Sequence, residues 1–96
     1  MMYAIAFNLD QEMLSKACKD LTYATACSEI ERILKLYGFA RQQGCVYFGE
    51  VDAVHCVLAV QSIAKRFPWF SASLKNIQMF RIEDNNDLMP AVDAVL

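Results

Sequence analysis

The order in which strand-like and helix-like patterns follow one another is the feature that most restricts the fold of this chain. Apolar residues recur at three- and four-residue steps over 22–37 and again over 53–67, as on one face of an amphipathic helix. Between these segments, 39–43 and 45–49 read as two short strands around Gly44, a typical hairpin signal. Strand-like runs at 2–9 and 76–82 flank the whole arrangement. The order β-α-β-β-α-β predicts an α+β fold of the ferredoxin-like, split βαβ type, a sandwich with both helices on one face of an antiparallel sheet.

Length and composition suggest how the open face of that sheet is used. A chain of 96 residues makes a single domain over 1–96, and residues 88–96 form a mildly helical C-terminal extension. The hydrophobic fraction is 56%, whereas roughly 45–50% is usual. We therefore expect a second copy of the chain to cover the helix-free face and give a homodimer.

Charge and hydropathy restrict the partners further. The net charge of −2 provides no general basic field, so DNA is not expected as a partner and any RNA site would have to be local. No apolar run approaches the roughly 20 residues of a membrane span. Because no secretion signal is evident either, we expect a cytoplasmic protein without a membrane partner and with reduced thiols at its four cysteines.

The strand at 2–9 carries the first candidate residue. Its odd-numbered residues are large and apolar, while Ala4, Ala6 and Asn8 face the other side. Such a strand is expected to be buried on both faces, where Asn8 would need a hydrogen-bonding partner, most simply a backbone group. Asp10 could provide a carboxylate near Asn8 or, as the simpler alternative, cap a short helix that starts at Gln11.

The hairpin and the last strand carry the other candidates. Cys45 could be a nucleophile, and the Tyr47 phenol could orient a phosphate or stack on a base, although each could equally be an ordinary strand residue. Arg41 and Arg81 could bind RNA phosphates or form surface ion pairs. The single histidine, His55, falls on the polar side of the second helix, which favours a surface residue over a general base.

Three segments of the chain form a recognisable set: YAIAFNL at the start, GFARQQGCVY after the first helix and IQMFRIED in the last strand. Together they resemble the virulence-associated protein D (VapD) family, whose pattern is close to YAIAFDL, GF-x-R-x-QGS-x-Y and IRAFRIE. The resemblance implies a ferredoxin-like homodimer that cleaves RNA and is similar to the small CRISPR-associated endoribonucleases. It also implies that a small antitoxin protein is a possible partner, since some members act as toxins.

The resemblance also implies site residues. The strand-one aspartate of the family falls on Asn8, near the expected two-fold axis, and the QGS-x-Y segment falls on the hairpin. The implied catalytic positions are Asn8, Gln43, Cys45 and Tyr47. The arginines of the family motifs fall on Arg41 and Arg81, which are the implied RNA contacts.

Two of these positions depart from the family pattern, since Asn8 replaces an aspartate and Cys45 a serine. An amide lacks the charge that a general base or a metal ligand needs, whereas a thiol keeps a small polar group in place. The sequence leaves open whether the change at position 8 is natural or introduced, and whether Mg²⁺ takes part. It predicts an endoribonuclease toxin with reduced or no activity or, alternatively, a non-catalytic homodimeric module that binds RNA or protein.

Overall fold

The computed structural model describes the whole chain, residues 1–96. Strands and helices alternate in the predicted order, with short helices added near both ends and before the last strand. The elements are β1 (Met2–Leu9), α1 (Gln11–Ala17), α2 (Tyr23–Leu36), β2 (Phe39–Gln43), β3 (Val46–Gly49), α3 (Ala53–Arg66), α4 (Pro68–Ser73), β4 (Leu74–Ile82) and α5 (Met89–Asp93).

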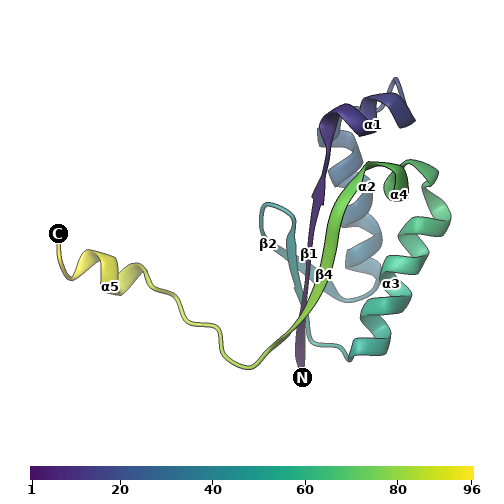
Figure 1. The fold of residues 1–96 in the computed structure, drawn as a ribbon. Coiled ribbons are helices and arrows are strands. Elements are labelled where there is room, and N and C mark those ends of the chain that lie inside the picture. The colour runs from purple at the N-terminus through teal and green to yellow at the C-terminus, as the bar shows by residue number, and fades with distance from the viewer.

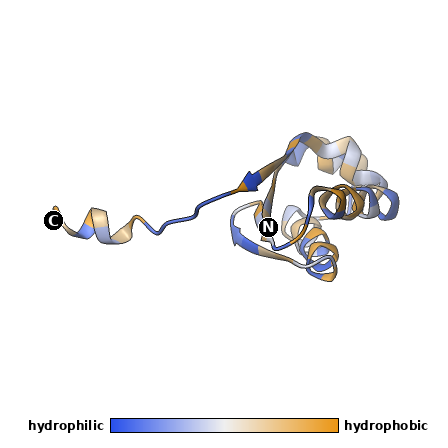
Figure 2. Cartoon of the chain, turned by 90° about the horizontal axis from the view of Figure 1, so that it is seen from below, coloured by the Kyte–Doolittle hydropathy of each residue, from blue (hydrophilic) through white to orange (hydrophobic).

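The four strands form one antiparallel sheet in the order β2-β3-β1-β4. Each long helix connects two strands that have a third strand between them: α2 leads from β1 to β2 around β3, and α3 leads from β3 to β4 around β1. This is the split βαβ connection, so the predicted α+β class is confirmed and the topology is compatible with the predicted ferredoxin-like fold. Figures 1 and 2 show α2 and α3 on one side of the sheet, with the opposite side free of helices.

The hydrophobic core lies between the sheet and the two long helices. From β1 it receives the large odd-numbered side chains predicted from alternation, and from α2 it receives the predicted apolar stripe. The buried core residues are Ile5, Phe7, Leu9, Leu14, Ala26, Ile30, Ile33, Leu34, Phe39, Tyr47, Cys56, Ala59, Ile63 and Phe70. Because this core uses only one face of the sheet, the other face has no packing partner within the chain.

Polar caps and two glycines fix where the elements begin and end. Asp10, Thr22 and Asp52 each accept a hydrogen bond from the backbone N–H three residues on, which begins α1, α2 and α3. Gly38 (φ 90°) ends α2, and Gly44 (φ 50°) is the first central residue of the β2–β3 turn, a place where a positive φ favours glycine.

The structure corrects the predicted hairpin in one detail. Cys45 was expected in the second strand of the hairpin, but β3 begins only at Val46, and Cys45 is the second residue of the turn. Its carbonyl still accepts a hydrogen bond from the Phe7 N–H at 3.1 Å, so the turn is attached to the central strand.

The C-terminal extension is the part of the chain that lies furthest from the core. After β4, a hydrophilic segment at 83–87 and Leu88 lead to the short helix α5, and Figures 1 and 2 show both extending away from the body on the side opposite to the helices. Most apolar residues of the extension are exposed, including Leu88, Met89, Val92 and Leu96. None of the helices has the length and apolar character that crossing a bilayer requires.

Candidate functional site

Asn8 lies near the end of β1 on the helix-free face of the sheet. It is exposed, and its Nδ2 donates a hydrogen bond to Oδ1 of Asn76, its direct neighbour on β4, at 3.3 Å. The expectation of a buried amide satisfied by backbone was therefore wrong for the single chain. The reason is that all the covering helices lie on the other face of the sheet, so the even-numbered side chains near the end of β1 stay open to solvent.

Gln43 lies on the same face as Asn8. Its neighbour in the β2–β3 register is Val46, which in turn neighbours Ala6 on β1, and directly opposed residues in an antiparallel sheet point the same way. Two residues along and two strands across correspond to roughly 12 Å between the Cα atoms of Asn8 and Gln43. The two side chains thus share a surface but are too far apart to contact the same atom of a ligand.

A pocket on the helix side of the hairpin is lined by Arg41, Cys45 and Tyr47. Residues of α2 form its other wall, and its volume is about 330 Å³. The lining residues are Tyr23, Ala24, Cys27, Ser28, Glu31, Arg41, Gly44, Cys45 and Tyr47. The sheet itself separates this Tyr23–Tyr47 pocket from Asn8.

Tyr47 combines a structural and a polar role in the pocket. Its ring is buried and stacks on Phe7 with 6.1 Å between ring centroids, which makes it part of the core. Its hydroxyl donates a long hydrogen bond of 3.5 Å to Oε1 of Glu31 on α2. Burial, reinforced by the nearby Glu31 charge, raises the pKa of Tyr47, so the phenol stays protonated at neutral pH and can donate a hydrogen bond but cannot accept a proton as a base.

Arg41 and Cys45 are held at the rim of the pocket. Nε of Arg41 donates a hydrogen bond of 2.8 Å to the Gly44 carbonyl, which fixes the exposed guanidinium beside the turn. The Cys45 Sγ lies 3.9 Å from the Tyr23 hydroxyl. Burial raises the pKa of Tyr23 to about 12, with a smaller contribution from the Cys45 thiol.

Arg81 lies in a third place, apart from the other candidates. Its neighbour in the sheet is Tyr3, five residues from Asn8 along β1, which corresponds to roughly 17 Å. Its Nε forms an exposed ion pair with Glu83 at 3.6 Å. The six candidate residues therefore divide into Asn8 and Gln43 on the open face, three residues in the Tyr23–Tyr47 pocket, and Arg81 at the far end of β4.

The two alternatives considered for acid or base chemistry have structural roles. Asp10 caps α1 through the Met13 N–H at 3.0 Å and pairs with Lys75 at 3.7 Å. The Met13 hydrogen bond is the main cause that lowers the pKa of Asp10. His55 is half-buried on α3, where its ring packs edge-on against Tyr37 at 5.6 Å. The capping prediction for Asp10 is confirmed. His55 forms no hydrogen bond and no aromatic ring contact with any of the six candidate residues.

Comparison with known proteins identifies the family. The chain is 45% identical over 93 residues to endoribonuclease VapD 2 of Riemerella anatipestifer, covering 95% of this chain and 99% of that protein. It is 43% identical over 97 residues to an endoribonuclease VapD homolog of Helicobacter pylori, covering 99% and 100% of the two chains. The chain belongs to the VapD family. An endoribonuclease VapD of Dichelobacter nodosus is 35% identical over 91 residues, with 95% and 97% coverage, although no protein-family model matches.

The residues around Asn8 do not fit a magnesium site. Mg²⁺ is held in proteins mainly by carboxylate oxygens, whereas the two side chains that meet here are the neutral amides of Asn8 and Asn76. Nowhere in the chain do three or more His, Cys, Asp or Glu side chains form a group that could hold a metal ion. The side chains that meet at Asn8 therefore offer no carboxylate to Mg²⁺.

Sequence reasoning missed the partners of the VapD motif residues. Asn76 contacts Asn8, Glu31 contacts Tyr47, and Tyr23 contacts Cys45. Tyr23 and Glu31 both lie in the helix predicted over 22–37, and the periodicity of that helix does not show which of its residues face the hairpin. The β1–β4 register would have revealed Asn76, but pairing between strands 68 residues apart cannot be read from alternation alone.

Proposed function

We propose that this chain is an endoribonuclease of the VapD type, an RNA-cleaving toxin of a toxin–antitoxin system whose activity is reduced because the catalytic aspartate is Asn8. Its relatives over nearly the full length are named endoribonucleases. The observation that carries the reduced activity is the neutral amide pair of Asn8 and Asn76 at the position of the family aspartate. RNA is the proposed substrate, a small antitoxin protein the proposed regulator, and the cytoplasm the proposed location.

The side chain at position 8 matters because RNA cleavage requires a proton acceptor. Endonucleolytic cleavage of RNA needs a group that accepts a proton from the attacking hydroxyl, either the RNA 2′-OH or water. A carboxylate at position 8 would accept this proton, whereas an amide is not basic near neutral pH. Asn8 is exposed in the single chain, so an acid in its place requires no rearrangement of the core.

The hairpin tip supports a path for RNA between the two groups of candidate residues. Gln43 projects from the open face and Arg41 from the opposite side of the same short edge strand, beside Gly44. A single RNA strand laid across this tip would reach the amide of Gln43 on one side and the Arg41 guanidinium on the other. In this arrangement Arg41 binds phosphate, and Cys45 and Tyr47 position the turn from inside the pocket.

The open face supports the proposed homodimer. It carries apolar side chains without a partner, among them Phe80, of which 47% is exposed. The C-terminal extension, with its exposed apolar residues, leaves the body on the same side (Figure 2), where it would pack against a second copy. A two-fold axis through this face would bring the two Asn8 residues toward one another.

The test is an Asn8→Asp variant incubated with RNA, with and without magnesium, beside the unmodified chain and a neutral Asn8→Ser control. Restoring one acid–base group should increase cleavage by about 10²–10⁴-fold, and Asn8→Ser should give no increase. Circular dichroism and the dimer mass should be the same for all three proteins. RNA that stays equally intact with folded, dimeric Asn8→Asp would overturn the assignment of Asn8.

The second candidate function, a non-catalytic homodimeric module that binds RNA or protein, is favoured by the same amide pair and by the exposed apolar extension. Under this alternative the unmodified chain binds a short RNA or a folded partner tightly, and Asn8→Asp cleaves nothing. Filter binding with labelled RNA separates the two, because an impaired nuclease gains cleavage with Asn8→Asp at nearly unchanged affinity. Partner binding without RNA affinity would favour the protein-interaction role.

A further inference from the structure

Two thiols share the pocket between α2 and the hairpin. Cys27 projects from α2 and Cys45 from the β2–β3 turn; both are half-buried, and both line the 330 Å³ pocket with Tyr23. The Cys45 Sγ is 3.9 Å from the Tyr23 hydroxyl. Burial raises the pKa of Cys27, and the neighbouring Cys45 thiol raises it further, as expected for two thiols in close proximity.

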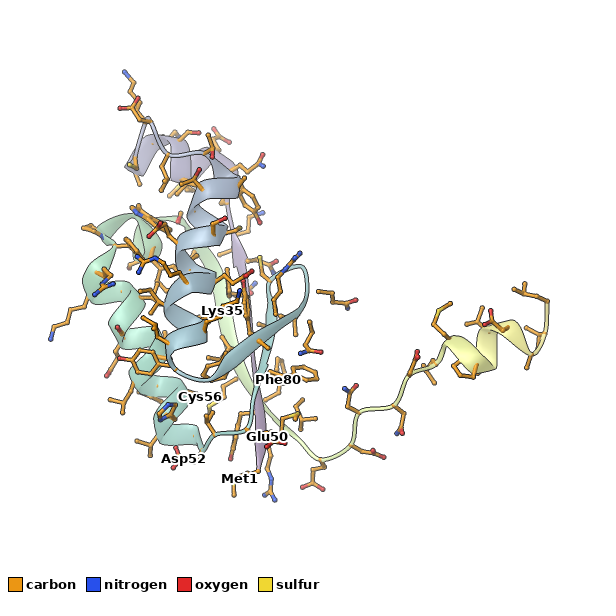
Figure 3. The ribbon with its side chains drawn as sticks, turned by 180° about the vertical axis from the view of Figure 1, so that it is seen from behind. Met1, Lys35, Glu50, Asp52, Cys56 and Phe80 are labelled. Atoms are coloured by element: carbon orange, nitrogen blue, oxygen red, sulfur yellow. The ribbon has the colours of Figure 1, made fainter.

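The other two cysteines have no such neighbour. Cys56 is a buried residue of α3 (Figure 3) and lines a separate apolar groove between α3 and β4. Cys18 is the C-cap residue of α1. Cys27 and Cys45, by contrast, line one pocket together, and Cys45 is a position where the VapD pattern has serine.

The outer side of the turn that carries Cys45 faces open space. A Cβ atom added to Gly44 would meet nothing within 4 Å, so the tip of the hairpin is not packed from outside. In α2, by contrast, Ala26 and Ile30 are fully buried and hold Cys27 in place. A disulfide requires Cα atoms roughly 4.4–6.8 Å apart, and a small shift at the open Gly44 side of the turn is the adjustment that this would need.

We propose that Cys27 and Cys45 form a reversible intramolecular disulfide that fastens the tip of the β2–β3 hairpin to α2. With hydrogen peroxide as oxidant, the Cys45 thiolate attacks one peroxide oxygen, the O–O bond breaks, and a sulfenic acid and hydroxide form. The Cys27 thiolate then displaces hydroxide from that sulfur and closes the S–S bond. The two hydroxides take up the two thiol protons, so two thiols lose two electrons and one peroxide becomes two waters.

The cross-link would stiffen the surroundings of Arg41 and Tyr47, which line the same pocket. It closes the chain segment between positions 27 and 45, and a loop of this size should raise the melting temperature by roughly 15 °C. Because burial raises the pKa of Cys27, its thiolate is scarce at neutral pH and oxidation should become faster as the pH rises toward 9.

The sequence allows an unambiguous mass-spectrometric test on the full chain. After peroxide treatment, alkylation and denaturation, trypsin together with a glutamyl endopeptidase places the four cysteines on separate peptides, with Cys27 in 20–29 and Cys45 in 42–50. We expect these two peptides to be joined, with loss of two hydrogens, and dithiothreitol to separate them. Thermal unfolding of the same sample should show the increase, absent in Cys27→Ser and Cys45→Ser and retained in Cys18→Ser.

Other products would overturn the proposal. These are Cys45 recovered as sulfinic or sulfonic acid without a link to Cys27, a link between two chains on a non-reducing gel, or both thiols still free after the treatment. An increase in melting temperature that persists in Cys45→Ser would have the same meaning. The proposal does not depend on RNA cleavage, because its readouts are a peptide mass and a melting temperature.

Discussion

Replacing Phe80 by serine tests the dimer most directly. Phe80 lies on β4, where its neighbour in the sheet is Ala4 of β1, so its ring projects from the face that no helix covers (Figure 3). In the chain alone, 47% of Phe80 is exposed. In the proposed dimer this remaining surface is buried against the second copy.

The structure gives the size of the expected effect. A phenylalanine side chain presents roughly 200 Å², so about 90 Å² remains to be buried when the copies associate. At about 25 cal/mol per Å², this burial contributes about 2 kcal/mol for each copy. A two-fold axis repeats the contact, so Phe80→Ser should weaken the dimer by about 4–5 kcal/mol, or about 10³-fold in dissociation constant.

The adjacent Met79 provides a matched control. Its exposed fraction of 43% is nearly equal, but its neighbour in the sheet is Ile5, so it faces the helix side and lines the groove beside α3. Met79→Ser should therefore leave the dissociation constant nearly unchanged. Sedimentation over a concentration series measures this constant for both variants, and circular dichroism checks that each is folded.

Two results would refute the reasoning. One is a Phe80→Ser protein with the dissociation constant of the unmodified chain. The other is a Met79→Ser protein that is weakened as much as Phe80→Ser, because the dimer would then use another surface, such as the groove between α3 and β4.

Further predictions concern single side chains and pH. Tyr47→Phe removes only the 3.5 Å hydrogen bond to Glu31 and should cost at most about 1 kcal/mol in urea unfolding, whereas Tyr47→Leu should cost roughly 2–4 kcal/mol; equal losses would contradict this. Asp10→Ala should lower the melting temperature by roughly 5 °C, and Asp10→Asn, a good cap, by much less. Folding lowers the pKa of Asp10, so its contribution is present above 3.8 and disappears as the pH falls below that value. Burial raises the pKa of Cys27 and of Cys56 above 9.0, so the free energy of unfolding should fall as the pH rises past 9. The fall should be less steep in a Cys27→Ser, Cys56→Ser double variant.

Local rules were sufficient to predict much of the scaffold from the sequence. The Asp10 cap and the apolar periodicity over 22–37 and 53–67 depend on neighbours within four residues, and α1, α2 and α3 lie where these patterns predict helices. The predicted helix over 53–67 and the predicted strand over 76–82 left the segment between them without an element, so the short helix α4 was missed, although Pro68 is a residue favoured at the first position of a helix.

The candidate site was harder to predict because it depends on which face each residue takes. Within the hairpin, Gln43 and Tyr47 are only four residues apart, yet the turn places one on the open face and the other in the pocket. The motif brings Gln43, Cys45 and Tyr47 together along the chain, which made a single catalytic cluster the natural prediction. Strand pairing and the turn at Gly44, which decide the actual grouping, involve contacts that sequence spacing does not contain.

The exposure of Asn8 decides how an amide or an acid at position 8 affects the fold. A buried aspartate would have required compensating partners, and its replacement by asparagine would have relieved the fold of a costly charge. Asn8 is exposed and its side chain hydrogen-bonds the amide of Asn76, whose Nδ2 is able to donate to a carboxylate at position 8 instead. The fold therefore gains little from the amide, and an acid in its place would be satisfied by the same neighbour. In the single chain an acid at position 8 displaces no packed group, so Asn8→Asp changes the chemistry of the open face and leaves the scaffold intact.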